Sequence, residues 1–197
     1  MTPNEQFAIS YYMGRNLTKD AAVGITSVLV CESDLHTGSQ GVQASETPGA
    51  LNPSGAYGIA SWNGPRQAAL KAFADKYGLQ VSYLETQLHF VLTEAADSYK
   101  EFWTAIVSPA SKYADVISVM VDTYEIPANK EAEISKAMGI AAGLYGEYTL
   151  PSNAVGSTVT PPVTAPTATP ISSNQTLFSV ELVSEVLTLL KKYGVVL

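Results

Sequence analysis

Apolar residues recur through most of the chain up to residue 148 at the three- and four-residue spacing of an amphipathic helix. A helix with one apolar stripe buries that stripe against its neighbours, so a series of such segments predicts a helical domain. On this spacing we expect helices over 4–13, 18–32, 65–77, from 82 onward, over 112–124 and over 129–145.

Capping residues mark several of these helix ends. Thr18 is a suitable N-cap for the second helix, and Ser82 starts the fourth. Pro65 is typical of a first helical position, while Gly78 is typical of a helix end and Pro127 separates the last two helices. Residues 38–62 contain five glycines and two prolines, which predict a loop or a small β-hairpin.

The composition changes sharply after this region. Residues 151–176 consist largely of Pro, Thr, Ser, Ala and Val, without an aromatic or charged residue, and such a segment cannot form a core. Residues 177–197 again show a helical apolar stripe. We therefore expect a mainly α-helical domain with a small irregular or β-hairpin lobe over 1–148, a Pro/Thr/Ser-rich linker over 149–176 and a short C-terminal amphipathic helix over 177–197.

Charge and cysteine content exclude several classes of function. The net charge of −7 argues against nucleic acid as a partner, because phosphate binding depends on clustered Lys and Arg. The single cysteine, Cys31, cannot form an internal disulfide, and we expect no metal and no cofactor because no Cys/His cluster has ligand spacing. We also expect no membrane span and no classical signal peptide.

One acidic residue lies on the apolar stripe of the second helix. Ala21, Ile25, Val28 and Glu32 share a face at a 3.6-residue period, so Glu32 extends the buried side to the helix end. Burial and the negative end of the helix dipole both raise the pKa of such a carboxyl group. A carboxylic acid that stays protonated near neutral pH is suited to general-acid cleavage of a glycoside. The alternative is a solvated glutamate at a frayed helix end.

Four stretches resemble the phage tail lysozyme family, a branch of the lysozyme-like superfamily. They are the "CES" at the end of the second helix, "SGAYGIASWNGPRQAAL" after the glycine-rich loop, "LETQLHFVLTE" and "YEIP". They follow one another in the order expected for the family and cover about residues 5–146. The resemblance implies a lysozyme-like fold and an enzyme that cleaves peptidoglycan glycosidic bonds.

The resemblance also implies roles for particular residues. Glu32 would be the general acid, and Tyr124 would lie near it as a hydrogen-bonding catalytic partner. Residues 58–62 would form a wall of the substrate cleft. The residues expected to bind substrate are Ser33, Tyr57, Gly58, Ile59, Ser61 and Trp62.

Two positions depart from the family pattern. Ser61 stands where a glutamine is expected before the tryptophan, and Ile126 stands where an arginine is expected after the Tyr-Glu pair. The first change affects the expected sugar contacts more than the class of reaction.

A second catalytic carboxylate is usual in glycoside hydrolases. Asp34 and Glu46 are the candidates, although solvated acids are the default on a loop and some lysozyme-like enzymes use a single acid. The remaining reactive side chains are assigned no catalytic role. We expect His36 and His89 on the surface or on a helix face, and Cys31 as a buried inert thiol.

Three functions remain open at this point. The first is a muramidase that hydrolyses the bond between N-acetylmuramic acid and N-acetylglucosamine, and the second is a lytic transglycosylase that uses the same acid. The third is a non-catalytic virion or tail protein that keeps the fold. We expect bacterial peptidoglycan as partner, with other virion or tail proteins binding the C-terminal helix. The expected location is the virion tail or the host periplasm and cell wall.

Overall fold

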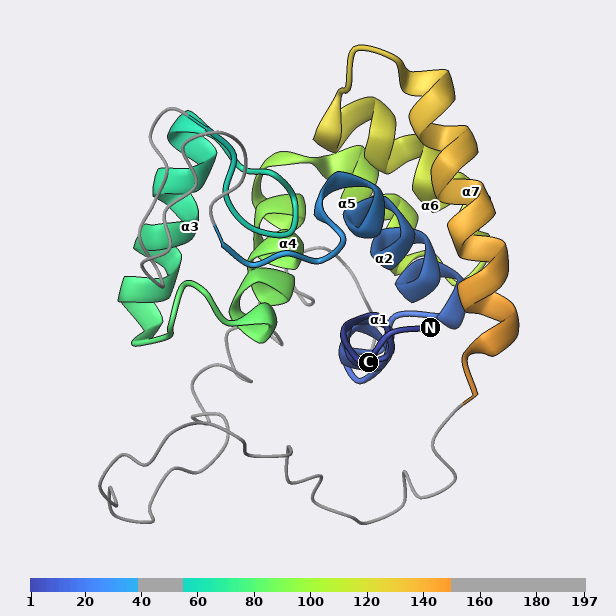
Figure 1. Ribbon diagram of the computed structural model, residues 1–197, viewed down its shortest axis with the longest axis horizontal. Helices are drawn as coiled ribbons and strands as arrows, with labels where there is room; N and C mark the ends of the chain where they lie inside the picture. Colours follow the sequence, from blue (N-terminus) through green and yellow to red (C-terminus); the bar gives the residue numbers. More distant parts are fainter. Residues whose placement is uncertain (39–54, 150–197) are drawn as a thin grey trace. The chain divides into compact units, whose positions relative to one another are not determined.

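A computed structural model of the chain describes residues 1–38 and 55–149. Within this part the domain is built from α-helices (Figure 1). The elements in chain order are α1 Pro3–Met13, α2 Lys19–Ser33, α3 Gly64–Tyr77, α4 Leu84–Ser98, α5 Lys100–Val107, α6 Tyr113–Met120, the π-helical turn η1 Val121–Glu125 and α7 Lys130–Glu147. The mainly helical fold predicted from the sequence is confirmed.

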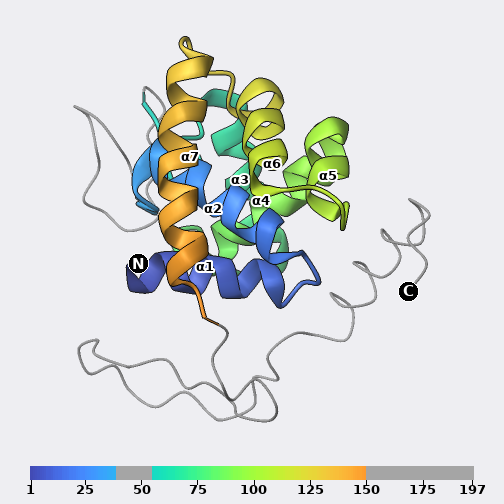
Figure 2. The same cartoon turned by 90° about the vertical axis from the view of Figure 1, so that its right-hand side faces the viewer.

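Helix α2 forms the centre of the domain. It packs against α1, α5, α6 and α7, and nine consecutive residues from Ala21 to Leu29 are buried. Figure 2 shows α7 and α6 running beside α2, with α1 across one end. Gly24 permits the close contact with α6, because a Cβ there would lie 2.9 Å from the Cβ of Val116. The apolar stripe predicted on α2 is thus part of a helix that is buried on every side.

The capping residues act as expected at three helix ends. The Thr18 side chain accepts a hydrogen bond from the Ala21 N–H, and Pro65 lies in the first turn of α3. Gly78 ends α3 in the left-handed conformation, with φ of +65°. Helix α4 begins two residues later than predicted, because Tyr83 rather than Ser82 occupies the N-cap position.

Two elements differ from the sequence-based expectation. The eight-residue helix α5 is not among the predicted helices, although Phe102 and Ile106 give it a buried i, i+4 pair. The helix expected over 112–124 is divided, since α6 ends at Met120 and continues as the π-helical turn η1. Both features lie beside the site described below.

The part of the irregular lobe that the structure describes contains one antiparallel bridge, between Tyr57 and Trp62, and no longer β-ladder. The remainder of the predicted lobe, residues 39–54, lies outside the described residues, as do the predicted linker and C-terminal helix beyond residue 149.

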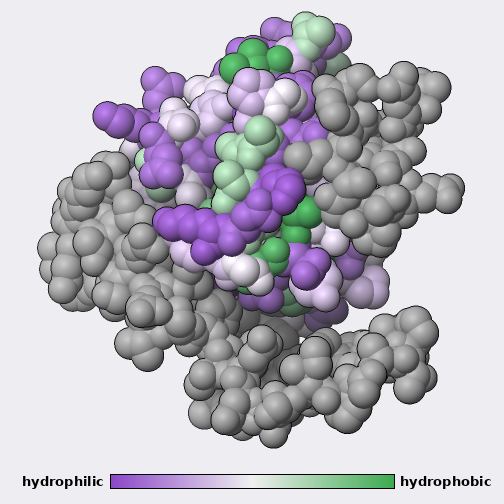
Figure 3. Space-filling view, turned by 90° about the vertical axis from the view of Figure 1, so that its left-hand side faces the viewer, coloured by the Kyte–Doolittle hydropathy of each residue, from purple (hydrophilic) through white to green (hydrophobic). Residues whose placement is uncertain are grey.

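The face of the domain in Figure 3 is mainly polar where the described residues are visible. On the face shown in Figure 3, apolar side chains of the described residues gather only in small separate patches. The large apolar side chains that are exposed are Met1, Phe7, Leu79, Tyr83, Ile126 and Tyr145. Among the helices that the structure describes, none is long and apolar enough to cross a membrane.

Candidate active site

Glu32 lies in the last turn of α2, where the helix emerges from the core. Its side chain is half-buried, and the helix ends two residues later at Asp34 in the left-handed conformation. Burial raises the pKa of Glu32, and the negative charge of Glu133 on α7 raises it further. Lys136, Arg66 and a hydrogen bond from Ser61 act in the opposite direction without cancelling the rise. The environment therefore favours the protonated carboxyl group.

Two serines join the end of α2 to the loop before α3. The Ser33 hydroxyl donates to the backbone carbonyl of Ile59 at 2.8 Å. The Ser61 hydroxyl donates to the backbone carbonyl of Glu32 at 3.1 Å. Ser33 at the end of α2 thus bonds the backbone of the loop, and Ser61 of the loop bonds the backbone of α2. Together the two hydrogen bonds fix the position of Glu32 relative to the loop.

The loop itself is held by close packing around Gly58. A Cβ at this position would lie 2.7 Å from Gln87 Oε1 and 2.8 Å from the Trp62 ring, and φ is +74°. Gln87 is fully buried, accepts a hydrogen bond from the Ile59 N–H at 3.0 Å and donates to the Thr37 carbonyl at 2.8 Å. The loop is thus a rigid support for one side of the site.

The residues predicted to bind substrate have different degrees of exposure. Tyr57, Ile59 and Trp62 are fully buried, so their side chains form the interior of the loop. A direct sugar contact by these three side chains would require the loop to open. Ser33 and Ser61 are half-buried and lie at the loop edge next to Glu32. A substrate role for the predicted residues remains a prediction.

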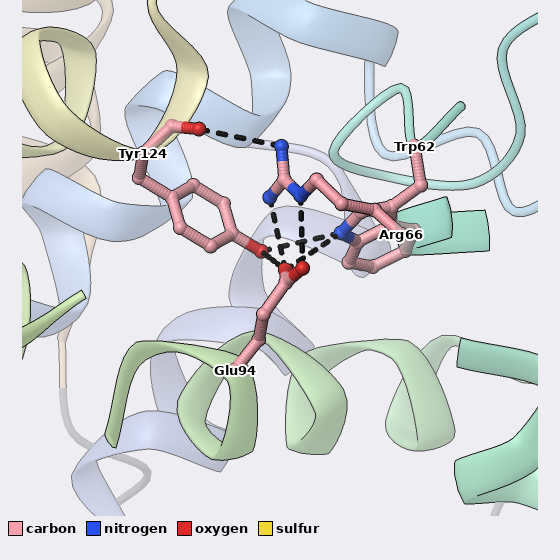
Figure 4. A network of polar contacts seen from close by, with 4 residues as sticks. All are labelled: Trp62, Arg66, Glu94 and Tyr124. Atoms are coloured by element: carbon pink, nitrogen blue, oxygen red, sulfur yellow. Dashed lines mark hydrogen bonds and ion pairs between the residues drawn. The ribbon is translucent and has the colours of Figure 1, made fainter. Parts of the chain in front are cut away.

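A buried polar network lies behind the loop and centres on Glu94 of α4 (Figure 4). Arg66 of α3 donates to both carboxylate oxygens, at 2.8 Å from Nε and 2.9 Å from Nη2. The Tyr124 hydroxyl donates to Glu94 at 2.7 Å, and Trp62 Nε1 donates to the same oxygen at 3.1 Å. Four hydrogen bonds from three side chains thus satisfy a carboxylate whose side chain is only 10% exposed.

The network gives the Tyr124 hydroxyl a partner that the sequence did not indicate. The family resemblance implies a place near Glu32, which stays a prediction, and the structure shows a hydrogen bond to Glu94. The physical reason is the fold of η1, which buries the Tyr124 ring against Tyr99 and Phe102 and directs its hydroxyl toward α4. A catalytic contribution of Tyr124 would therefore act through the network.

The structure describes one of the two predicted second carboxylates. Asp34 is exposed at the end of α2, and Glu46 lies outside the described residues. Two other acids influence the site, Glu125 at the end of η1 and Glu133 on α7. Sequence analysis missed both, although Glu125 is part of the quoted "YEIP". The available signal was the position of Glu125 just before Pro127, because a proline cannot continue the helix.

Three further reactive side chains have non-catalytic surroundings. Burial raises the pKa of the Cys31 thiol to about 12, and the charge of Glu133 adds to the rise, so the thiol is inert. His36 is exposed, whereas His89 is half-buried with its ring 5.1 Å from that of Phe73. Among the residues that the structure describes, no group of three or more His, Cys, Asp or Glu side chains could hold a metal ion.

Comparison with known proteins now identifies the family. No curated protein matches the chain. The family model described as phage tail lysozyme matches residues 3–148, which span every helix described above and the Glu32 region. The chain therefore belongs to the phage tail lysozyme family, and this membership supports a lysozyme-like enzyme that acts on peptidoglycan.

Proposed function

We propose that this protein is a muramidase that cleaves the bond between N-acetylmuramic acid and N-acetylglucosamine, with Glu32 as general acid. The observation that carries the proposal is the position of Glu32: a half-buried carboxyl group at the end of a buried helix, beside a rigid loop. Burial and the charge of Glu133 raise the pKa of Glu32, and a raised pKa keeps the proton available near neutral pH.

The proposed reaction begins with proton transfer. The carboxyl proton of Glu32 moves to the glycosidic oxygen as the bond from that oxygen to the sugar C1 breaks, which leaves Glu32 ionised. Water then adds its oxygen to C1, and its proton returns to Glu32. Arg66 lies within electrostatic range of Glu32 and stabilises the ionised state.

A lytic transglycosylase is the second candidate, and one observation favours keeping it. Among the described residues, Glu125 and Glu133 each have a carboxylate oxygen that is buried without a hydrogen-bond partner, so neither offers that oxygen to an attacking water. In a transglycosylase the muramyl 6-hydroxyl attacks C1 in place of water, and Glu32 alone supplies and recovers the proton.

Product analysis tests the proposal. Purified peptidoglycan is incubated with the full chain while turbidity is followed, and the released muropeptides are identified by mass. A muramidase gives products with a free reducing end at the muramic acid. A transglycosylase gives anhydro ends, each lighter by one water. Turbidity and product pattern identical to an enzyme-free control would support the third possibility, a non-catalytic virion protein.

Family membership fits action in a virion or at the cell wall, with peptidoglycan as substrate. We propose tail association as the route of delivery, with the predicted helix over 177–197 as the segment that binds other virion or tail proteins. That helix lies outside the described residues, so the proposal rests on its apolar stripe and on the linker that precedes it.

A further inference from the structure

The "LETQLHFVLTE" motif on α4 contains two polar side chains that the mechanism above does not use. Gln87 and Glu94 lie seven residues apart, which places them on one face of the helix. Glu94 binds the indole N–H of Trp62, at the end of the loop over residues 57–62. Gln87 lies two turns earlier, is fully buried and reaches the middle of the same loop.

The amide group of Gln87 joins three segments that are distant in the sequence. Its Oε1 accepts a hydrogen bond from the Ile59 N–H of the loop at 3.0 Å. Its Nε2 donates to the Thr37 carbonyl, four residues after α2, and to the Val81 carbonyl before α4, each at 2.8 Å. The oxygen and both amide hydrogens are therefore used. One buried side chain thus holds together the loop, the segment after α2 and the connection between α3 and α4.

A short path of hydrogen bonds leads from Gln87 to the proposed general acid. The N–H of Ile59 binds Gln87, and the carbonyl of Ile59 accepts from the Ser33 hydroxyl at 2.8 Å. Ser33 follows Glu32 directly in the chain. Two residues further along the loop, Ser61 donates to the Glu32 carbonyl at 3.1 Å. The loop is therefore bound to Gln87 on one side and to the backbone around Glu32 on the other.

The backbone that follows Glu32 is strained. Asp34 and Leu35 both adopt the left-handed conformation, with φ of +54° and +58°, which is unfavourable for residues other than glycine. Strain of this kind persists where the surrounding structure imposes it, and it is concentrated at functional sites. The hydrogen bond from Gln87 to the Thr37 carbonyl fixes the chain two residues beyond this turn. Gln87 therefore holds the strained turn as well as the loop.

We propose that Gln87 is a positioning residue for the general acid. Its amide group fixes the loop and the strained turn relative to each other, and thereby the position of Glu32 against the glycan. Gln87 itself is buried and takes no part in proton transfer. Because a proton is transferred over the length of a hydrogen bond, a displacement of Glu32 by about 1 Å lowers the rate. This inference rests on the proposed role of Glu32 as general acid.

Gln87→Met tests the inference in the full chain, because it keeps the length of the side chain and removes its hydrogen bonds. The substrate is a soluble glycan strand of alternating N-acetylglucosamine and N-acetylmuramic acid. We expect kcat to fall about 10- to 100-fold, with KM changed by less than about twofold. Gln87→Glu keeps the acceptor for the Ile59 N–H and, when protonated, one donor, so it should recover part of kcat.

Two control variants separate positioning from a loss of stability. Leu88→Ala removes a fully buried side chain at the next position of α4 and destabilises the domain, but it leaves the hydrogen bonds of Gln87 in place. Glu131→Gln changes an exposed acid on α7. Well below their melting temperatures, both variants should keep kcat within about twofold of the wild type.

Three results of this assay would overturn the inference. An unchanged kcat in Gln87→Met would mean that Glu32 does not depend on Gln87. A rise in KM at unchanged kcat would mean that Gln87 supports substrate binding only. An equal loss of kcat in Leu88→Ala and Gln87→Met would mean that lower stability is the cause.

A double-variant cycle tests the path through Ile59. Ser33→Ala removes the donor to the Ile59 carbonyl, and Gln87→Met removes the acceptor for the Ile59 N–H. Because both changes act on Glu32 through the same residue, the loss of kcat in the double variant should be smaller than the product of the two single losses. A loss equal to that product would show two independent effects and would contradict the path.

Amide hydrogen exchange gives a readout that does not depend on activity. In Gln87→Met the Ile59 N–H loses its buried acceptor, so its exchange rate relative to that of the Leu144 N–H on α7 should rise about tenfold. In Leu88→Ala this ratio should not rise, because the loop keeps its anchor. An unchanged ratio in Gln87→Met would contradict the anchoring of the loop by Gln87.

The exchange measurement also separates this inference from the proposed function. If the wild-type chain released no muropeptides, the proposed function would fail and the positioning role with it, whereas the exchange rates would still show whether Gln87 anchors the loop. If the wild type cleaved glycan and Gln87→Met kept the wild-type kcat, only the present inference would fail.

Discussion

Arg66 binds the carboxylate of Glu94 through two parallel hydrogen bonds, 2.8 Å from Nε to Oε1 and 2.9 Å from Nη2 to Oε2. This fork joins α3 to α4 directly behind the loop that contacts Glu32. A planar guanidinium matches a carboxylate in a way that the single ammonium group of lysine cannot. The pair therefore fixes the loop as well as stabilising the domain.

We predict that Arg66→Lys lowers the free energy of unfolding by about 2–3 kcal/mol, because it leaves a largely buried carboxylate with poorer hydrogen bonding. Chemical denaturation measures the effect. The exposed Lys71–Asp75 pair, at 2.7 Å on α3, serves as the control. Asp75→Asn should cost less than about 1 kcal/mol, since exposed ion pairs contribute little. Equal losses for the two variants would contradict a special role of the fork.

The hydroxyl of Tyr124 offers a second test of the network. Tyr124→Phe keeps the ring contacts with Tyr99 and Phe102 but removes the donor to Glu94. We expect a loss of about 1–2 kcal/mol in the free energy of unfolding, with kcat/KM reduced no more than about threefold well below the melting temperature. The sequence-based hypothesis predicts the reverse, reduced turnover with nearly unchanged stability. Measuring both quantities on one preparation distinguishes these accounts.

Local features of the fold could be predicted from the sequence because their causes are local. Thr18 caps α2 by bonding a backbone N–H three residues away, and Gly78 ends α3 because it tolerates a positive φ. Glu32 could be assigned to the end of a buried helix for the same reason, since the helical period places it on the stripe of Ile25 and Val28.

The remaining features depend on contacts between distant segments. Glu133 influences Glu32 only because α7 packs along α2, which no short-range spacing indicates. The pairing of Tyr124 with Glu94 depends on the π-helical turn, whose extra residue changes the direction of the side chains that follow. The period of an ordinary helix through 112–124 could not reveal that the carboxyl group of Glu125 is buried.

Stability should depend on pH through His89. Burial lowers its pKa from 6.5 to about 4, and the positive charge of Arg15 adds to this effect. The folded state therefore binds this proton less tightly than the unfolded state, so the contribution of His89 to stability is complete above pH 6.5 and is lost as the pH decreases toward 4. We expect a loss of up to about 3 kcal/mol over this range.

Denaturation at several pH values measures this dependence. His89→Gln should flatten the curve between pH 6.5 and 4, whereas His36→Gln, at an exposed position, should leave it as in the wild type. Parallel curves for the wild type and His89→Gln over this interval would refute the role of His89.

Tyr148 joins the end of α7 to the rest of the domain. Tyr148 is 4% exposed, its hydroxyl hydrogen-bonds with the Ser10 hydroxyl at 3.0 Å, and its carbonyl accepts from Lys19 at 3.0 Å. We predict that a chain of residues 1–148 unfolds cooperatively near the melting temperature of the full chain. A chain that ends at residue 147 should be less stable by about 2 kcal/mol, because it lacks the buried ring. Loss of the cooperative transition in 1–148 would show that the C-terminal segment belongs to the core.

The proposed role of Glu32 is tested most directly by muropeptide release from Glu32→Gln, measured by mass beside its melting temperature. We predict that release falls by a factor of about 10²–10⁴ or more, because glutamine cannot donate the proton. The melting temperature should stay the same or rise, because the substitution removes an acid that burial and the helix end disfavour. Glu131→Gln should release muropeptides at the wild-type rate. Release at the wild-type rate from Glu32→Gln would contradict the assignment of Glu32 as the general acid.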